Sequence, residues 1–385
     1  MARSRGRRIG GYVDYSLIFI IIVLLGFGLV MVYSTSSYEA SVSSALQNDA
    51  AYYLKKQAFA MIFGLIIMTI MSVIPYTFWE RFAVIGYGVS AALIFLVLTP
   101  LGYEANGARR WLNLGISVQP AEIAKLAMIL FLASLVCRMG NAIKTKKGFL
   151  LVLASPVPIC LMVWFITDNL SSAIIIFAIG FVMLFVASPD YKRFWQLLLV
   201  GAIVVAIAVL IIVKAAGTGA FGFRGARVLA WLHPEEYSSG TGFQTLQSLY
   251  AIGSGGVFGK GLGQSTQKLG FIPEAQNDMI FSIICEELGL FGGICIIILF
   301  ILMLWRLMII ANNAKDQFGG LLVVGVMGHI AIQVILNIAV VTNTIPNTGI
   351  SLPFISYGGS SVMFLLIELG LVFSVGRSID FRDRD

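Results

Sequence analysis

Carboxylates at the edge of apolar runs are the side chains in this sequence best suited to chemistry. Asp278 opens a long apolar run, directly after the segment Pro273-Glu-Ala-Gln-Asn277. A carboxylate at such a boundary is partly desolvated, so its pKa should rise toward the range useful for a general base. The alternative is that Asn277 or Asp278 only caps the following helix. Glu286 and Glu287 lie deeper in the run, where they are expected to bond neighbouring helices.

A second group of charges precedes an earlier apolar run. Arg109 and Arg110 could grip a diphosphate through charge-assisted hydrogen bonds, or could be ordinary exposed loop charges. Glu122 and Lys125 follow Pro120, are three residues apart and share one helical face, so they could form an ion pair within the apolar run. That pair could be structural, or it could serve a ligand.

A glycine-rich segment, residues 253–268, contains Gln264 and Lys268. Glycines at this density let backbone N–H groups approach an anionic ligand closely. The segment is not a nucleotide-binding P-loop, because Lys260 is followed by Gly261 rather than by Ser or Thr. We therefore expect no nucleotide cofactor.

A third candidate segment is punctuated by Pro and Gly and runs from Asn343 to Ser361, with Ser356 inside it. It is expected to be a re-entrant stretch leading into the last apolar run, since non-helical backbone at membrane depth is tolerated where it lines a cavity. The structural alternative is that the small residues 358–361 only permit close helix packing.

Membrane helices must position these groups. The chain has 385 residues, of which 58% are hydrophobic and only 12% charged, whereas soluble domains are about 25% charged. Its apolar runs are continuous rather than alternating, which excludes a β-barrel and predicts an all-α polytopic membrane protein with about ten transmembrane helices. The spans are predicted near residues 15–35, 58–75, 82–100, 121–137, 148–167, 171–187, 194–213, 279–304, 318–341 and 354–376.

The predicted organisation is a single membrane domain over residues 1–385, with a basic N-terminus at 1–14, a large loop at 214–278 between the seventh and eighth spans, and a tail at 377–385. Basic residues gather in the short loops on the side of the two termini, so the positive-inside rule places both termini in the cytoplasm and the large loop outside. This explains the net charge of +7 without nucleic acid. The large loop is expected to form a folded outer lobe with a short helix at 246–252.

The segments singled out above resemble, in order along almost the whole chain, the motifs of the shape, elongation, division and sporulation family, which includes FtsW, RodA and SpoVE. The matching residues are Gly107-Ala-Arg-Arg-Trp-Leu112, Gln119-Pro120 with Glu122 and Lys125, Gln247-Ser-Leu-Tyr-Ala-Ile-Gly-Ser-Gly-Gly256, Gly261-Leu-Gly-Gln-Ser265, Pro273-Glu274, Glu286-Glu-Leu-Gly289 and Leu352-Pro-Phe-Ile-Ser-Tyr-Gly-Gly359. The stretch from Val340 to Tyr357 looks closer to the division and sporulation branch.

The chain also departs from the family pattern. Gln276-Asn277-Asp278-Met279 stands where the family commonly has His-Thr-Asp-Phe, and Thr167-Asp168-Asn169 stands where it has Gln or Glu, then Pro-Asp. The acid is retained at both places while its neighbours change. The flanking positions therefore carry no assigned role.

The resemblance implies a peptidoglycan glycosyltransferase that polymerises lipid II at the outer face of the bacterial cytoplasmic membrane, with Asp278 as the general base. It implies a single inverting displacement with undecaprenyl diphosphate as the leaving group. The residues expected to bind substrate are Arg109, Arg110, Glu122, Lys125, Gln264, Lys268 and Ser356. A divalent cation, Mg²⁺ or Mn²⁺, could assist, at a site that the sequence does not identify.

The expected partners are lipid II, membrane lipid and a class B penicillin-binding protein, with no nucleic acid. Two other functions suit the same architecture: a lipid II flippase, and a non-catalytic scaffold that recruits the penicillin-binding protein. A transporter should carry polar groups through its midplane. The strongest motifs here gather toward one face, which favours the enzyme.

Overall fold

The computed structural model describes residues 12–105, 107–113, 117–188, 190–214, 222–238, 240 and 242–379. Most of the predicted basic N-terminus, residues 1–14, and most of the predicted tail, residues 377–385, therefore lie outside the described residues.

The described chain is mainly helical. Its helices are α1 (Tyr15–Val42), α2 (Tyr52–Val73), α3 (Tyr76–Glu80), α4 (Ala83–Leu96), α5 (Pro120–Met139), α6 (Lys146–Ala154), α7 (Val157–Ile166), α8 (Leu170–Ala187), α9 (Tyr191–Lys214), α10 (Gly222–Leu232), α11 (Phe243–Gly255), α12 (Ile280–Asn312), α13 (Gln317–Val341) and α14 (Gly359–Arg377), with 3-10 turns η1 (Ser44–Leu46) and η2 (Gly140–Lys144). Three short strands, β1 (Gly102–Ala105), β2 (Ala108–Asn113) and β3 (Ser117–Val118), form an antiparallel sheet in that order.

Nine helical stretches within the described residues are long and apolar enough to cross a membrane, and the shorter apolar helix α4 falls where the sequence predicts one more span. The prediction of an all-α polytopic membrane protein with about ten spans is confirmed. The helix boundaries differ from the predicted spans where a helix extends beyond its apolar run, or where part of the apolar run is not helical. Helix α2 begins at Tyr52, well before its apolar run, and α14 begins only at Gly359, after the Pro- and Gly-containing segment.

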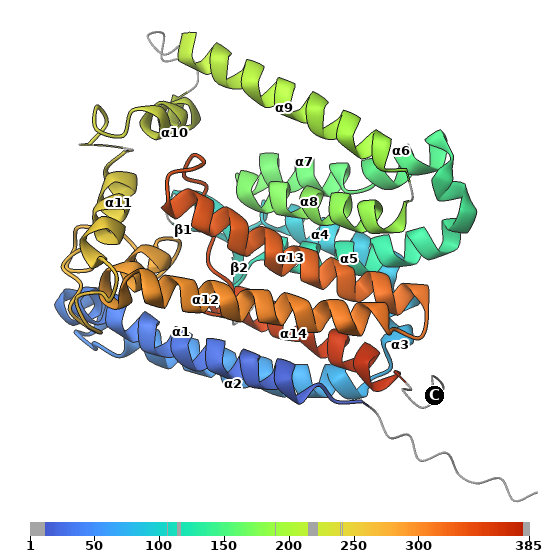
Figure 1. The fold of residues 1–385 in the computed structure, drawn as a ribbon, viewed down its shortest axis with the longest axis horizontal. Coiled ribbons are helices and arrows are strands. Elements are labelled where there is room, and N and C mark those ends of the chain that lie inside the picture. Colours follow the sequence, from blue (N-terminus) through green and yellow to red (C-terminus); the bar gives the residue numbers. More distant parts are fainter. Residues whose placement is uncertain are drawn as a thin grey trace, which may run out of the picture.

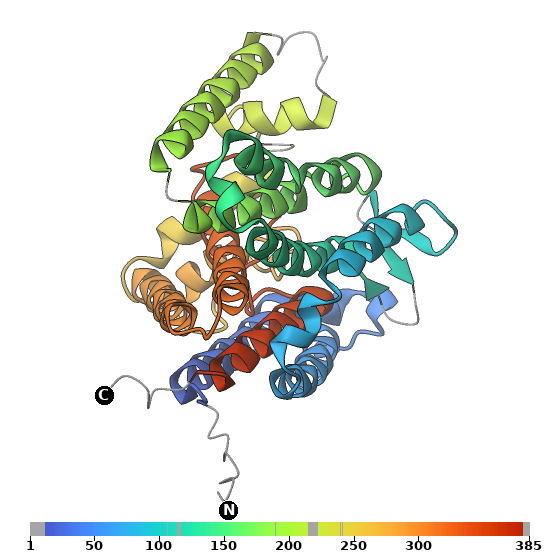
Figure 2. The same ribbon diagram turned by 90° about the vertical axis from the view of Figure 1, so that its right-hand side faces the viewer.

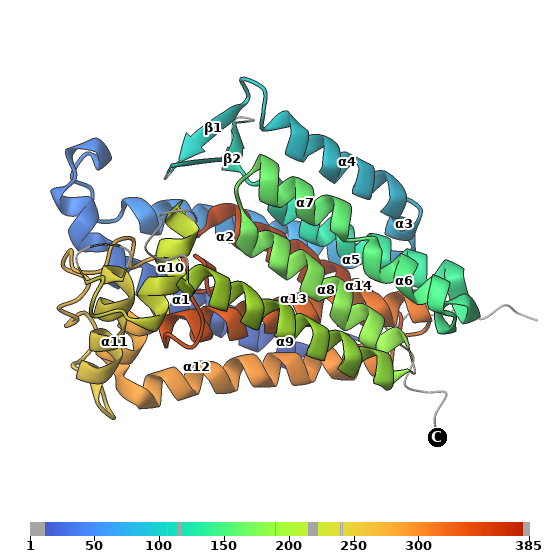
Figure 3. The ribbon, with the colours of Figure 1, turned by 90° about the horizontal axis from the view of Figure 1, so that it is seen from above.

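The helices run side by side along the long axis of the molecule (Figure 1). The start of α1 and the end of α14 lie at one end of this bundle, while α10, α11 and the strands lie at the other (Figure 1). We call the second the loop end. Figure 3 shows that strands β1 and β2 lie beside α4 and α7, whereas α11 lies on the other side, next to the start of α12.

Helix α13 is at the centre of the bundle, where it packs against α5, α8 and α12, and α14 packs along α2. Helix α9, in contrast, lies at the periphery of the bundle. It stands apart from the other spans (Figures 1 and 2), and among its residues only Phe194 is buried. An apolar helix with this exposure requires lipid around it.

The large loop between α9 and α12 is folded over its described residues. It contains α10 and α11, and α11 extends the short helix predicted at residues 246–252 to Phe243–Gly255. Helix α11 packs against α12. The predicted folded lobe is thus present, and its side of the membrane stays a prediction.

Candidate functional site

The elements of the loop end meet at the segment between α13 and α14, residues 342–358, which we call the connecting loop. Helix α10 holds its start, because the Trp231 indole nitrogen donates to the Asn343 carbonyl at 3.0 Å. From α11, the Ser248 hydroxyl donates to the Val341 carbonyl at 3.0 Å. The folded loop between α9 and α12 is therefore fixed by polar bonds to the end of α13 and the start of the connecting loop.

Asp278 lies beside this loop, two residues before α12 begins at Ile280. Gln244 of α11 donates to its carboxylate oxygen Oδ1 at 3.5 Å, and Asn347 of the connecting loop donates to the Gln244 side-chain oxygen at 2.9 Å. Gly349 has φ +69°, and a Cβ built there would come 3.8 Å from the other carboxylate oxygen. Asp278 is thus framed by α11 and the connecting loop.

The Asp278 carboxylate is half-buried, and within the described chain no ion pair joins it to a cation. Its pKa is raised to about 6, mainly by burial and to a smaller extent by the negative charge of Glu274, while backbone hydrogen bonds and the positive charge of Arg227 oppose the increase. The group is therefore ionised at neutral pH and close enough to its pKa to exchange a proton readily.

The predicted pairing of Glu122 and Lys125 is present in the structure. The two side chains meet at 2.8 Å in the first turns of α5, and only 1% of the Lys125 side chain and 7% of the Glu122 side chain are exposed. One oxygen of Glu122 has no hydrogen-bond partner among the described residues. A role of this pair in binding substrate stays a prediction.

Arg109 and Arg110 point to opposite sides of β2. The Arg109 guanidinium donates to the carbonyls of Thr99, at 2.7 Å, and Gly102, at 2.9 and 3.1 Å. The Arg110 guanidinium donates to the carbonyls of Thr167, at 3.2 Å, and Asp168, at 2.8 Å. Both therefore organise turns of the loop end, and their binding of a diphosphate stays a prediction.

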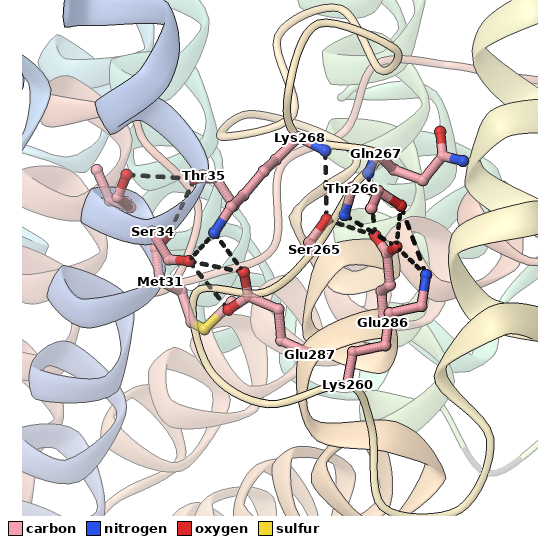
Figure 4. A network of polar contacts seen from close by, with 11 residues as sticks. Met31, Ser34, Thr35, Lys260, Ser265, Thr266, Gln267, Lys268, Glu286 and Glu287 are labelled. Carbon is pink, nitrogen blue, oxygen red and sulfur yellow. Dashed lines mark hydrogen bonds and ion pairs between the residues drawn. The ribbon is translucent and has the colours of Figure 1, made fainter.

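Lys268 has a different environment from the one expected of a diphosphate ligand. It is 8% exposed, and its ammonium group pairs with Glu287 at 2.7 Å and donates to Ser34 of α1 at 2.9 Å (Figure 4). Ser34 in turn donates to both oxygens of Glu287, at 2.8 and 2.9 Å. The lysine thus compensates a buried carboxylate, which argues against an additional partner of the same charge.

Glu286 points the other way and is compensated separately (Figure 4). Lys260 pairs with it at 2.7 Å, the hydroxyl of Ser265 donates to it, and the hydroxyl of Thr266 donates to it at 3.0 Å. The expectation that both glutamates bond neighbouring helices is correct for Glu287, which reaches α1, and wrong for Glu286, whose partners all come from the glycine-rich segment.

This glycine-rich segment also interrupts α12. Gly289 has φ 70° and ψ −171°, and around it the amides of Lys260 and Gly261 donate to the carbonyls of Glu286 and Glu287 at 3.0 and 2.9 Å. The amide of Leu290 donates to the Gly256 carbonyl at 2.9 Å. The loop thus replaces the helical hydrogen bonds lost at the break.

The two remaining predicted binding residues lie apart. Gln264 is exposed in the glycine-rich segment. Ser356 is buried, and its hydroxyl accepts from the Leu352 amide at 2.8 Å, which closes a turn of the connecting loop. Neither is shown in contact with Asp278, so their substrate roles stay predictions.

Comparison with known proteins agrees with this architecture. Residues 15–380 match the model of a family described as "Cell cycle protein" and labelled with the names FtsW, RodA and SpoVE. The chain belongs to the FtsW/RodA/SpoVE family. It is 39% identical over 367 residues to stage V sporulation protein E of Bacillus subtilis, covering 94% of this chain and 97% of that protein.

Two further relatives extend this family assignment. A probable peptidoglycan glycosyltransferase FtsW of Trichlorobacter lovleyi is 36% identical over 368 residues, covering 95% of this chain and 93% of the relative. The rod shape determining protein RodA of Thermus thermophilus has a solved structure with TM-score 0.68 and 27% identity, covering 95% of this chain and 97% of that one.

A chain in a solved structure described as "Structural coordination of polymerization and crosslinking by a peptidoglycan synthase complex" is also similar. It has TM-score 0.76 and 28% identity, covering 95% of this chain and 98% of that one. The fold of this FtsW/RodA/SpoVE family member is therefore shared with proteins of peptidoglycan synthesis.

Three polar residues beside Asp278 in this family member escape the motif analysis: Gln244, Asn337 and Asn347. Of the three, Asn337 could have been found from the sequence. It follows His329 and Gln333 at intervals of four in an otherwise apolar run. Such spacing places all three on one helical face. Gln244 lies in the first turn of α11, and Asn347 lies in the Pro- and Gly-containing connecting loop, where no motif singles it out.

The described part of the chain has no cluster of three His, Cys, Asp or Glu side chains that could bind a divalent cation by themselves. Mg²⁺ often binds through one or two carboxylates together with substrate phosphates. Mg²⁺ or Mn²⁺ therefore stays a prediction, compatible with the residues if the cation arrives with a diphosphate.

Proposed function

We propose that this protein is a peptidoglycan glycosyltransferase that polymerises lipid II at the outer face of the bacterial cytoplasmic membrane. The observation that carries the proposal is the Asp278 carboxylate, which is half-buried at the loop end, has no ion pair to any residue that the structure describes and has a pKa raised to about 6. The names of the relatives and of the similar synthase complex support the same activity.

The reaction needs little more than a base and correct alignment, because lipid II carries its own leaving group. Asp278 accepts the proton of the acceptor sugar's 4-hydroxyl, and the hydroxyl oxygen attacks the anomeric carbon of the donor sugar. The C–O bond to the diphosphate breaks on the opposite face, and its electron pair leaves with undecaprenyl diphosphate. One displacement inverts the anomeric configuration, and the carboxylate is then regenerated by losing its proton to water.

Arg109 and Arg110 are the best candidates for stabilising the leaving diphosphate, since both guanidiniums lie in the strand region of the loop end. Part of the Arg109 side chain is exposed despite its backbone bonds. Planar guanidinium groups bind phosphate oxygens bidentately. Lys125, buried against Glu122, would have to exchange partners to take part, and Lys268 would leave Glu287 buried and uncompensated.

The proposed orientation has both termini in the cytoplasm, which puts α10, α11 and Asp278 on the outer side. The positive-inside distribution supports it, as does the common end at which α1 begins and α14 ends (Figure 1). The proposed protein partner is a class B penicillin-binding protein, because the similar chain comes from a complex that couples polymerization to crosslinking.

The deciding experiment is glycan synthesis from labelled lipid II by the purified protein, alone and with a cognate class B penicillin-binding protein. Wild type would be compared with Asp278→Ala and Asp278→Asn. Asp49→Asn is the matched control, since Asp49 is a loop acid whose side chain is 35% exposed and paired with Lys55. General bases contribute about 10²- to 10⁴-fold, so loss in that range is expected for both Asp278 variants and none for the control.

Each other outcome has a distinct meaning. Full activity in folded Asp278 variants would move the base elsewhere. No glycan from wild type even with its partner would reject the polymerase. Transfer of labelled lipid II across vesicles by that inactive protein would then favour a flippase, and its absence a scaffold.

A further inference from the structure

Asn337 lies in α13, directly beneath the turn that carries Asp278, and its side chain is fully buried. Its amide nitrogen donates to the backbone carbonyl of Asp278 at 2.7 Å and to the backbone carbonyl of Ile350 at 2.7 Å. An amide NH₂ group has two hydrogens, so one side chain satisfies both carbonyls. The turn before α12 and the connecting loop are thus joined through a single residue.

The joined positions face each other across the proposed site. Ile350 follows Gly349, and a Cβ at Gly349 would come 3.8 Å from the Asp278 carboxylate. The bond to Ile350 therefore sets the distance between that carboxylate and the backbone opposite it. Among the described side chains, only Gln244 bonds the carboxylate itself, and it does so at 3.5 Å, a long and weak contact.

Asn337 is the top of a polar column on one face of α13. One turn deeper, Gln333 donates to the Ser351 carbonyl at 3.1 Å, and one turn deeper again His329 lies 2.8 Å from Glu368 of α14. Gln333 thus anchors the same connecting loop as Asn337, and among the described residues it has no hydrogen bond to the Asp278 turn. This difference separates anchoring of the loop from placement of the carboxylate.

We propose that Asn337 is a positioning residue for Asp278, whose amide fixes the carboxylate against the connecting loop at the geometry needed for proton abstraction. The inference rests on the proposed function, in which Asp278 is the base. Asn337 itself does not touch substrate. Its effect passes entirely through the backbone of Asp278 and Ile350.

Removing the amide should change two measurable properties of the base. First, the carboxylate would lose its alignment, and misplacement on the ångström scale costs a reaction about 10²-fold. Second, separation of the two segments would admit water to the carboxylate and lower its pKa. The charged groups that face Asp278, Glu274 on its own turn and Arg227 on α10, are unchanged by the substitution.

The test compares Asn337→Leu, which keeps size and removes both donors, with Gln333→Leu as the matched control on the same face. Asn337→Ser is a milder variant that retains one donor and carries the test if Asn337→Leu does not fold. Full-length proteins would be assayed on lipid II with the partner present. The measurements are kcat, KM, the pH of half-maximal kcat and the melting temperature.

For Asn337→Leu we expect kcat to fall about 10- to 100-fold with KM nearly unchanged. The acid midpoint should move down by about half a pH unit or more, and Asn337→Ser should lie between it and wild type. Gln333→Leu should lower the melting temperature while its acid midpoint stays with wild type. Equal midpoints in all variants, or equal loss of kcat in the two leucine variants, would overturn the inference.

The proposed function is tested separately in the same assay. Inactive wild type, or active Asp278→Asn, would overturn that function and this inference with it. If wild type is active, Asp278→Asn is inactive, and Asn337→Leu has the kcat and acid midpoint of wild type, only the inference about Asn337 would be overturned.

Discussion

Asp278 and the adjacent pair Glu286 and Glu287 belong to one segment, yet their surroundings are opposite. Each glutamate has its own lysine at 2.7 Å and further donors from hydroxyl groups. Asp278 has no ion pair within the described chain, and the nearest side-chain donor, Gln244, is at 3.5 Å. The same chemical group is thus compensated fully at one place and hardly at all at the other.

The difference separates carboxylates that hold the fold from the one that we propose as the general base. A buried carboxylate paired with a lysine stays ionised and stabilises its surroundings only while the pair is intact. A carboxylate raised in pKa by burial, without a fixed partner, can take and release a proton near neutral pH. Lys260 and Lys268 pair with Glu286 and Glu287, and we call these two ion pairs the clamp. The clamp holds the glycine-rich segment to α12. Asp278 lies on the chain between the two.

The largest effect is expected from breaking the clamp at Glu287. In Glu287→Gln the buried Lys268 ammonium group would lose its counter-charge, and removing one partner of a buried ion pair costs about 3–5 kcal/mol. The melting temperature of the purified protein measures this loss. The double variant Lys268→Met with Glu287→Leu should recover much of it, because no charge is then left buried. A loss no larger than that of Asp49→Asn would mean that the pair does not hold the fold.

The second effect comes from the break in α12. Gly289 has a positive φ, and a Cβ there would overlap the carbonyl oxygen of Val257 in the docked loop. Gly289→Ala should therefore destabilise by about 2–3 kcal/mol through backbone strain and loss of loop contacts. Gly201→Ala is the control, since a Cβ on that residue of α9 would meet nothing within 4 Å. Similar melting temperatures for the two variants would contradict a tightly docked loop.

Local patterns predicted much of this molecule. Continuous apolar runs predicted the spans, because a helix that crosses a bilayer must be long and hydrophobic, and both properties can be read from a short stretch of sequence. The ion pair of Glu122 and Lys125 followed from a spacing of three on a helix. Asp278 stood out because an acid at the start of an apolar run is unusual.

Contacts between distant parts of the sequence could not be predicted in this way. Lys268 was expected to face a diphosphate, and nothing local indicates that Glu287 and Ser34 of α1 enclose it. The break at Gly289 depends on a loop that arrives from the preceding segment, so hydropathy shows a single span there. For the same reason Asn337 became meaningful only when its two carbonyl partners were known.

A smaller effect, with the opposite sign, is expected for the stability of Asp278→Asn. Because the native pKa of about 6 lies above the ordinary 3.8, the native state binds the proton more tightly than the unfolded state. Protonation of Asp278 therefore contributes stability that is complete below about pH 4 and is lost as pH rises through about 6. The neutral asparagine avoids the buried charge, so this variant should be more stable than wild type by roughly 2 kcal/mol at pH 8.

Melting temperatures of the two proteins across this pH range provide the check. The advantage of Asp278→Asn should shrink as pH falls and vanish near pH 4, while Glu287→Gln should be less stable than wild type at pH 8. If Asp278→Asn were also destabilised at pH 8, Asp278 would be a structural carboxylate like the glutamates, and the contrast between the two regions would fail.

The smallest effect is the pH dependence of wild-type polymerisation itself. If the reaction requires ionised Asp278, kcat/KM, which reports the pKa of the free protein, should be half-maximal near pH 6 and should fall about tenfold for each pH unit below that. Wild type and Asp49→Asn should share this midpoint, because Asp49 pairs with Lys55 and makes no hydrogen bond to Asp278 among the described residues. A midpoint near pH 4 would mean that water reaches the carboxylate during turnover, which would remove the desolvation that distinguishes Asp278 from an ordinary surface acid.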